Sequence, residues 1–119
     1  MKYDANKIKV IKSPDNIIDL VKEIEESPSL YLVGRSIFYL RAFIDGWYFR
    51  NTNIDVKMDA LMDFNSWLQK RNKLPDDFTW EKIILLYSQD EFVALNNFFS
   101  LFNKFIIETN YIDSNTDNL

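Results

Sequence analysis

The spacing of apolar side chains constrains the fold of this chain most, because apolar residues recur every three or four positions along much of its length. That spacing places them on one face of a helix. Residues that favour tight turns are scarce, since the 119 residues include only two Gly and three Pro, and folds rich in strands and turns usually need more. We therefore predict an all-α fold, a compact bundle of about five helices in one domain that spans residues 1–108.

Capping residues and proline predict where the first three helices begin and end. Ser13 suits an N-cap, Pro14 suits the first helical position, and the residue before Pro28 should end that helix. The second helix is expected to begin near residues 34–36 and the third to span roughly residues 55–71.

The last two helices are predicted from a second set of capping residues. Thr79 suits the N-cap of a short fourth helix. Ser88 to Glu91 fits a capping box, in which Ser88 caps the last helix and the Glu91 side chain bonds back to the backbone of Ser88.

The two ends of the chain differ from this helical pattern. Residues 7–12 alternate charged and apolar side chains, which predicts a short strand or an extended arm. Residues 109–119 are polar and are expected to form a frayed tail.

The stretch FYLRAFIDGWYFR, residues 38–50, contains six aromatic residues and raises the question of a binding surface. Its aromatic residues recur at helical spacing, so we interpret the stretch as the most buried, central helix of the bundle. Arg41 and Asp45 lie four positions apart on that helix and should form a partly buried ion pair, so that truncating Asp45 destabilises the fold. The alternative is a charged pair exposed at a groove.

Several classes of activity are made improbable by what the sequence lacks. The chain has no His and no Cys, which removes the commonest general base, metal ligand and thiol nucleophile. It also contains no glycine-rich phosphate loop or other catalytic motif. We expect a non-catalytic protein without cofactor or metal.

The charge and hydropathy of the chain indicate its class of partner. The net charge is −4, whereas nucleic-acid binding relies on clustered Lys and Arg. No signal peptide and no run of about 20 apolar residues is present, so no membrane span is expected and the cytoplasm is the default location. We predict a protein partner, with neither nucleic acid nor membrane as a target.

A series of acidic residues is the candidate partner-binding site. Three of them are spaced four apart and should form a ridge along the third helix, and three from the following loop and helix extend it. The six residues are Asp55, Asp59, Asp63, Asp76, Asp77 and Glu81. The ridge is either a negative surface for a basic partner or simply a solvated face.

Three basic residues, Lys70, Arg71 and Lys73, cluster where the third helix should end. There they complement the helix dipole, and nucleic-acid contact is the less favoured alternative.

Three segments carry a resemblance that covers residues 27–105. They are SPSLYLVGRSIFYLRAFIDGWYF (27–49), DFNSWLQKR (63–71) and TWEKIILLYSQDEFVALNNFFSLFNKF (79–105). In this order they resemble the small immunity-type proteins found beside secreted polymorphic toxins in bacteria. The chain departs from that pattern at Val33-Gly34, where Gly more often follows Leu directly.

The resemblance implies a protein that neutralises a cognate toxin, often a basic nuclease, by covering its active site. The acidic ridge, the acidic face of the first helix and nearby aromatic residues would then carry the contact, because complementary charge speeds encounter. The alternative is a helical regulatory or scaffolding module, and as a homodimer it would use aromatic residues as its interface. The sequence leaves monomer and homodimer both open.

Overall fold

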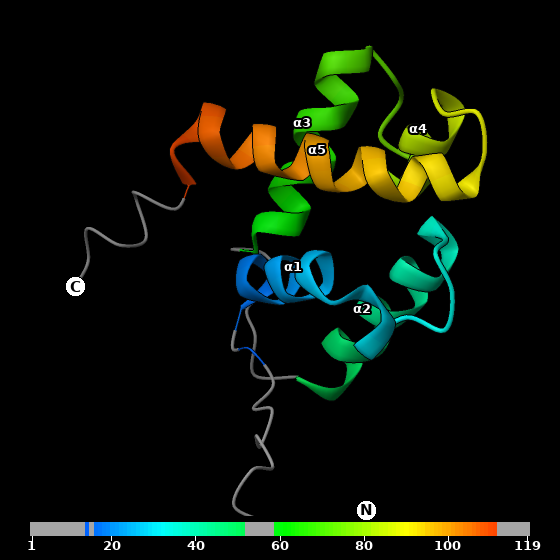
Figure 1. Ribbon diagram of the computed structural model, residues 1–119. Helices are drawn as coiled ribbons and strands as arrows, with labels where there is room; N and C mark the ends of the chain where they lie inside the picture. The colour runs from blue at the N-terminus through cyan, green and yellow to red at the C-terminus, as the bar shows by residue number, and fades with distance from the viewer. Residues whose placement is uncertain (1–13, 15, 52–58, 112–119) are drawn as a thin grey trace, which may run out of the picture.

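A computed structural model describes residues 14, 16–51 and 59–111 and confirms a compact all-α domain (Figure 1). Its elements are α1 (Ile17–Glu26), the short 3-10 helix η2 (Pro28–Leu30), α2 (Ile37–Arg50), α3 (Ala60–Asn72), α4 (Trp80–Leu86) and α5 (Glu91–Thr109). The described residues contain no strand, and the strand predicted over residues 7–12 lies outside them. None of the helices described is long and apolar enough to span a membrane.

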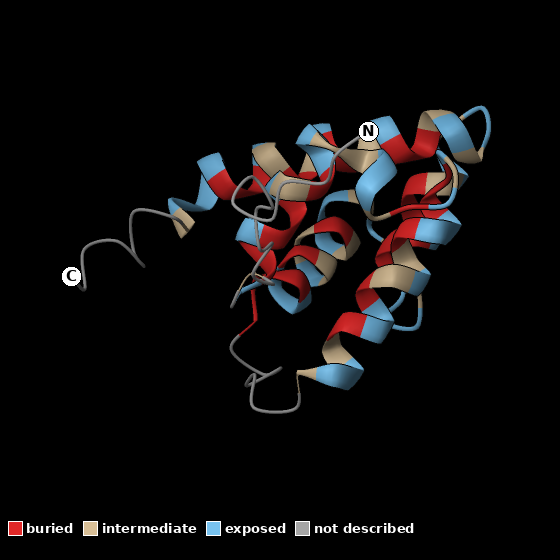
Figure 2. Ribbon diagram, turned by 60° about the horizontal axis from the view of Figure 1, so that its bottom comes forward, coloured by how far each residue is buried: buried red, intermediate tan, exposed pale blue. Residues whose placement is uncertain are grey.

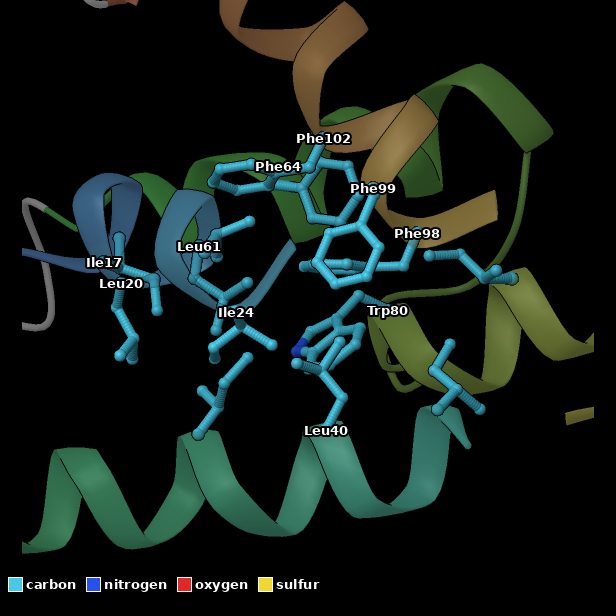
Figure 3. Close-up of a cluster of buried hydrophobic side chains, with 14 of the residues drawn as sticks. Ile17, Leu20, Ile24, Leu40, Leu61, Phe64, Trp80, Phe98, Phe99 and Phe102 are labelled. Carbon is cyan, nitrogen blue, oxygen red and sulfur yellow. The ribbon is translucent and has the colours of Figure 1, made fainter. Parts of the chain in front are cut away.

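α5 is the central helix, and this corrects the expectation for residues 38–50. It packs against α2, α3 and α4, while α1 contacts α3 and η2. Seven residues of α5 are buried, including four phenylalanines, against four buried residues in α2. In Figure 3, side chains of α1, α2 and α5 converge on this core, with Leu40 pointing from α2 toward Trp80.

Aromatic rings from two helices form the middle of the core. Phe64 of α3 lies edge-on to Phe98 and Phe102 of α5, at ring-centroid distances of 5.7 and 5.1 Å. Such edge-to-face pairs add to the free energy gained from apolar burial. Phe64, Phe98 and Phe102 are almost wholly inaccessible to solvent, so these aromatic rings join α3 to α5 in the middle of the core.

Two of the predicted helix starts are wrong by two or three residues. α1 begins at Ile17, because Asn16 is the N-cap and accepts a hydrogen bond from the Asp19 N–H. α5 begins at Glu91, because Asp90 accepts hydrogen bonds from the backbone N–H groups of Phe92 and Val93. A carboxylate at this position also faces the positive end of the helix dipole.

Ser88 therefore has a different role from the one predicted. Its hydroxyl donates to the Ile84 carbonyl at 2.6 Å and accepts from the Asn97 side chain at 2.9 Å. Ser88 joins the end of α4 to α5 and does not cap α5. Three other expected boundaries agree with the structure: the start of α2 near residues 34–36, Thr79 before α4 and Ser27 after α1.

The C-terminal end of α5 is more ordered than a frayed tail. Thr109 ends the helix, and Asn110 adopts the left-handed conformation, with φ of 53°, that commonly terminates helices. Tyr111 is half-buried and packs against Phe105 at a ring-centroid distance of 5.8 Å. Residues 112–119, the rest of the predicted tail, lie outside the described residues.

Candidate protein-binding surface

The six acidic residues predicted to bind a partner do not form one exposed ridge. Asp59 and Glu81 are buried, whereas Asp63, Asp76 and Asp77 are exposed. α3 begins at Ala60, not near residue 55, so the expected helical register of the ridge is wrong. Asp55 lies outside the described residues.

Asp59 is the N-cap of α3 and is committed to internal hydrogen bonds. Its carboxylate accepts from the Leu61 N–H at 2.8 Å and from the Tyr48 hydroxyl of α2. Burial raises the pKa of the Asp59 carboxyl above its ordinary value, and these two hydrogen bonds oppose that rise. Asp59 therefore joins two helices and offers no free charge to a partner.

Tyr111 lies near the same cluster of acidic groups. Burial, together with the negative charge of Asp63, raises the pKa of Tyr111 to about 12. Asp63 itself is exposed. The cluster ties the end of α5 to the start of α3.

The predicted pair of Arg41 and Asp45 is present, and it has a third member that the sequence reading did not identify. Arg41 Nε lies 3.0 Å from the Asp45 carboxylate, and Arg41 Nη1 lies 2.6 Å from Glu81 Oε2 of α4. The other oxygen of Glu81 accepts from the Thr79 hydroxyl at 2.7 Å. The Asp45 side chain is 57% exposed and that of Glu81 only 11%, so Glu81 is the buried partner.

Residues 38–50 were predicted to be the most buried helix, but the side of α2 that faces away from the bundle is exposed. We call this side the α2 outer face: Phe38, Tyr39, Ala42, Asp45, Gly46, Phe49 and Arg50, all of which are exposed. Phe49 is 86% exposed, and Phe38 and Tyr39 are each 47% exposed. In Figure 2, α2 runs into the grey segment 52–58 and is pale blue along its outward edge. Exposed apolar groups gathered on one face are typical of interaction sites.

Carboxylates border the α2 outer face on both sides. On the α4 side lies Glu81, which is buried and paired with Arg41 of α2. On the α1 side, Tyr31 packs edge-on against Phe43 of α2 at 5.6 Å and donates a 2.6 Å hydrogen bond to Glu23. This contact brings the acidic side of α1 next to α2.

The outer side of α1 is acidic, as the sequence predicted. Asp19, Glu25 and Glu26 are exposed, with Lys22 the one exposed cation of the helix. Glu25 accepts a hydrogen bond from Asn103 of α5 at 3.2 Å, which leaves Asp19 and Glu26 directed to solvent. The arrangement is an aromatic helix face with an acidic neighbour, a combination suited to a basic protein surface.

The basic cluster at the end of α3 has the structural role favoured from the sequence. Lys70 and Arg71 lie in the last turn, and Lys73 is the C-cap with φ of 54°. Arg71 stacks over Trp67 with 5.1 Å between its guanidinium carbon and the ring centroid. The residues complement the carbonyl end of the helix.

Within residues 14, 16–51 and 59–111, no group of three or more acidic side chains could hold a metal ion. Comparisons with protein families, with curated proteins and with solved structures give no match.

The sequence carried a signal for the α2 outer face that the prediction overlooked. Phe38, Ala42, Asp45 and Phe49 recur at helical spacing, as do the buried residues Ile37, Leu40, Ile44 and Trp47 on the other side. The buried set is wholly apolar, whereas the exposed set includes the charged residue Asp45. That charge marks the exposed side.

Proposed function

We propose that the protein is a non-catalytic, inhibitor-type binding protein that neutralises a bacterial toxin in the cytoplasm. The observation that carries the proposal is the α2 outer face, on which Phe38, Tyr39 and Phe49 are exposed. Aromatic residues dominate the energetics of protein interfaces when polar groups surround them. Here the exposed polar groups on the same helix are Asp45 and Arg50, and α1 adds the exposed carboxylates of Asp19 and Glu26.

The partner is proposed to be a basic protein domain. The chain has a net charge of −4, and α1 carries the exposed carboxylates Asp19, Glu25 and Glu26. Opposite charges on two proteins accelerate their association and favour one orientation over others. The resemblance of residues 27–105 to immunity-type proteins adds a specific candidate, a basic nuclease toxin encoded by a neighbouring gene.

The internal roles of the carboxylates support binding over catalysis. Asp59 is occupied by Tyr48 and Leu61, and Glu81 by Arg41 and Thr79. In the part of the chain that the structure describes, no buried side-chain polar atom lacks a hydrogen-bond partner. A catalytic carboxylate needs a substrate within reach, and these two are enclosed by the fold.

Co-purification with the product of the neighbouring gene tests this proposal. We expect a one-to-one complex whose formation abolishes the toxic activity. Its association rate should fall as salt is added, because the steering charges become screened. Failure of the folded protein to bind or inhibit that product would refute the toxin-neutralising function.

A second candidate, a homodimeric scaffolding module, is favoured by one feature of the same face. Ala42 and Gly46 lie on the outer side of α2, and nothing lies within 4 Å of where a Gly46 Cβ would be. Small residues there leave room for the helix of a second copy. Sedimentation equilibrium of the protein alone decides: a dimer that Phe49→Ser dissociates supports the scaffold, and a monomer excludes it.

A further inference from the structure

A groove between α3, α4 and α5 lies apart from the α2 outer face. Its volume is about 320 Å³, at the small end of the range of about 300–1,000 Å³ typical of ligand pockets. The three helices that form it gather in the upper part of Figure 1. Leu68, Ile83, Ile84 and Leu101 supply its apolar lining.

Hydrogen-bond donors lie at the edge of this lining. Arg71 is the one charged residue that lines the groove, and the hydroxyl-bearing Tyr87 and Ser100 line it as well. Neither hydroxyl makes a hydrogen bond to the residues that the structure describes, and Tyr87 is 62% exposed. The groove thus combines apolar walls with one cation and two available donors.

Arg71 is held in place without using up its N–H groups. Its guanidinium stacks on Trp67, and its nearest acidic atom, Glu108 Oε2, lies 3.9 Å away. That distance is too long for a hydrogen bond. Lys104 Nζ also lies 4.0 Å from Glu108, so Glu108 keeps a cation beside it when Arg71 pairs with another anion.

We propose that this groove binds a small amphipathic carboxylate, with its aliphatic body on the apolar lining and its carboxylate on Arg71. An apolar body would cover the exposed parts of Leu101 and Tyr87, because Leu68, Ile83 and Ile84 are already almost wholly buried. The carboxylate would accept hydrogen bonds from the Arg71 guanidinium, whose ion pair with Glu108 is long at 3.9 Å. Charge-assisted hydrogen bonds of this kind are among the stronger ones. The site is independent of the proposed function, since none of its lining residues belongs to α1 or α2.

Titration of the full-length protein with octanoate, followed by amide NMR, tests the site. We expect saturable shifts confined to the end of α3, to α4 and to residues 97–101 of α5. The matched probes 1-octanol and octylamine keep the body and change the head group. Octanol should bind about fivefold more weakly, because it lacks the charge that Arg71 recognises, and octylamine should bind more weakly still.

Four variants separate recognition by Arg71 from general charge and from apolar adsorption. Arg71→Gln should weaken octanoate binding about fivefold, whereas Lys104→Gln, with the same change in net charge, should alter it less than about twofold. Glu108→Gln should tighten binding by removing the competing carboxylate. Ser100→Trp, a substitution at an exposed position that fills the groove, should abolish the shifts.

Equal affinity for octanoate and octanol would overturn the proposal, as would unchanged binding in both Arg71→Gln and Glu108→Gln. Shifts centred outside the groove would do the same. If Arg71→Gln does not fold, Glu108→Gln still tests the proposal, because that variant is expected to bind octanoate more tightly. Toxin neutralisation would depend on a different surface, so a failure to neutralise the toxin does not affect the octanoate titration.

Discussion

Asp59 combines three tasks in one side chain: it caps α3, bonds to Tyr48 of α2 and carries a charge that the fold nearly encloses. A buried carboxylate is stabilised by its hydrogen bonds and destabilised by the loss of water around its charge. For Asp59 the loss of water is the larger effect, since the pKa of the carboxyl is raised. Asn at this position would keep the acceptor oxygen without the charge.

The sign of the resulting pH dependence follows from proton binding. The folded protein holds the Asp59 proton at pH values where the unfolded chain has released it, because the folded pKa is the higher of the two. Stability from Asp59 is therefore greatest below its ordinary pKa and is lost as the pH rises through its folded pKa. Asp59→Asn should remove this component, so the difference in unfolding free energy between the variant and the wild type should grow in the variant's favour as the pH rises.

Asp59→Ala supplies the matched comparison. It removes the cap and leaves the Tyr48 hydroxyl without its acceptor, and we expect a loss of about 3 kcal/mol in the free energy of unfolding. Urea denaturation of both variants across the acidic to neutral range measures these effects. A difference between wild type and Asp59→Asn that stays constant with pH contradicts the account.

Glu81 and Asp45 share Arg41 but should differ in their contribution to stability. Glu81→Ala should cost about 2 kcal/mol, because the Glu81 side chain is 11% exposed and also bonds to Thr79. Asp45→Ala should cost less than about 1 kcal/mol, because Asp45 is 57% exposed. From the sequence alone, Asp45 was the residue whose truncation was expected to destabilise the fold. Chemical denaturation of the two variants ranks them, and a larger loss in Asp45→Ala would show that the sequence-based ranking was right.

At the scale of the helices, apolar spacing predicted which elements exist but not every boundary. The apolar faces of α1, α3 and α5 follow from sequence alone, since Leu20, Phe64 and Phe98 lie at the expected positions and are buried. The start of α5 was missed because Ser88 and Asp90 are both good N-cap residues. The choice depends on Asn97 and Ile84, which occupy the Ser88 hydroxyl once the helices pack.

Gly46 is a position where a substitution should make α2 more stable. It lies in the interior of α2, is exposed, and has open space where a Cβ would be. Gly46→Ala should stabilise the protein by about 0.5–1 kcal/mol, because alanine loses less backbone entropy in a helix. Thermal unfolding checks this.

Gly34 provides the contrasting position, since a Cβ there would lie 2.9 Å from the Tyr39 ring. Gly34→Ala should therefore displace that ring and bring no comparable gain. A lower melting temperature for Gly46→Ala than for the wild type would mean that the space around Gly46 is not open as described.

At the scale of the whole molecule, the fold class was predictable and the distribution of exposed charged and aromatic residues only in part. The exposed acidic side of α1 was expected, and so was a contribution from aromatic residues. The prediction of an exposed acidic ridge was wrong because Asp59 and Glu81 are buried against Tyr48 and Arg41, which belong to another helix. Local spacing carries no information about such contacts.

The location of the aromatic surface is the other result that emerges only at this scale. α5 supplies enough phenylalanine to fill the core, including Phe98 and Phe102. α2 is therefore free to expose aromatic residues such as Phe49 while it buries Leu40 and Ile44. We regard this division between a core-filling helix and a surface-forming helix as the basis of the proposed function.

The affinity of two double variants for the neighbouring gene's product tests that claim most directly. Phe38→Ala with Phe49→Ala removes the two phenylalanines of the α2 outer face, and Leu86→Ala with Phe92→Ala removes two comparably exposed apolar residues elsewhere. Isothermal titration calorimetry should show a loss of about 30-fold or more for the first variant, because two interface aromatics that contribute about 1 kcal/mol or more each give about 2 kcal/mol or more together. The second variant should bind like the wild type. Equal losses in both variants, or none in the first with folding intact, would contradict the assignment of the α2 outer face as the binding surface.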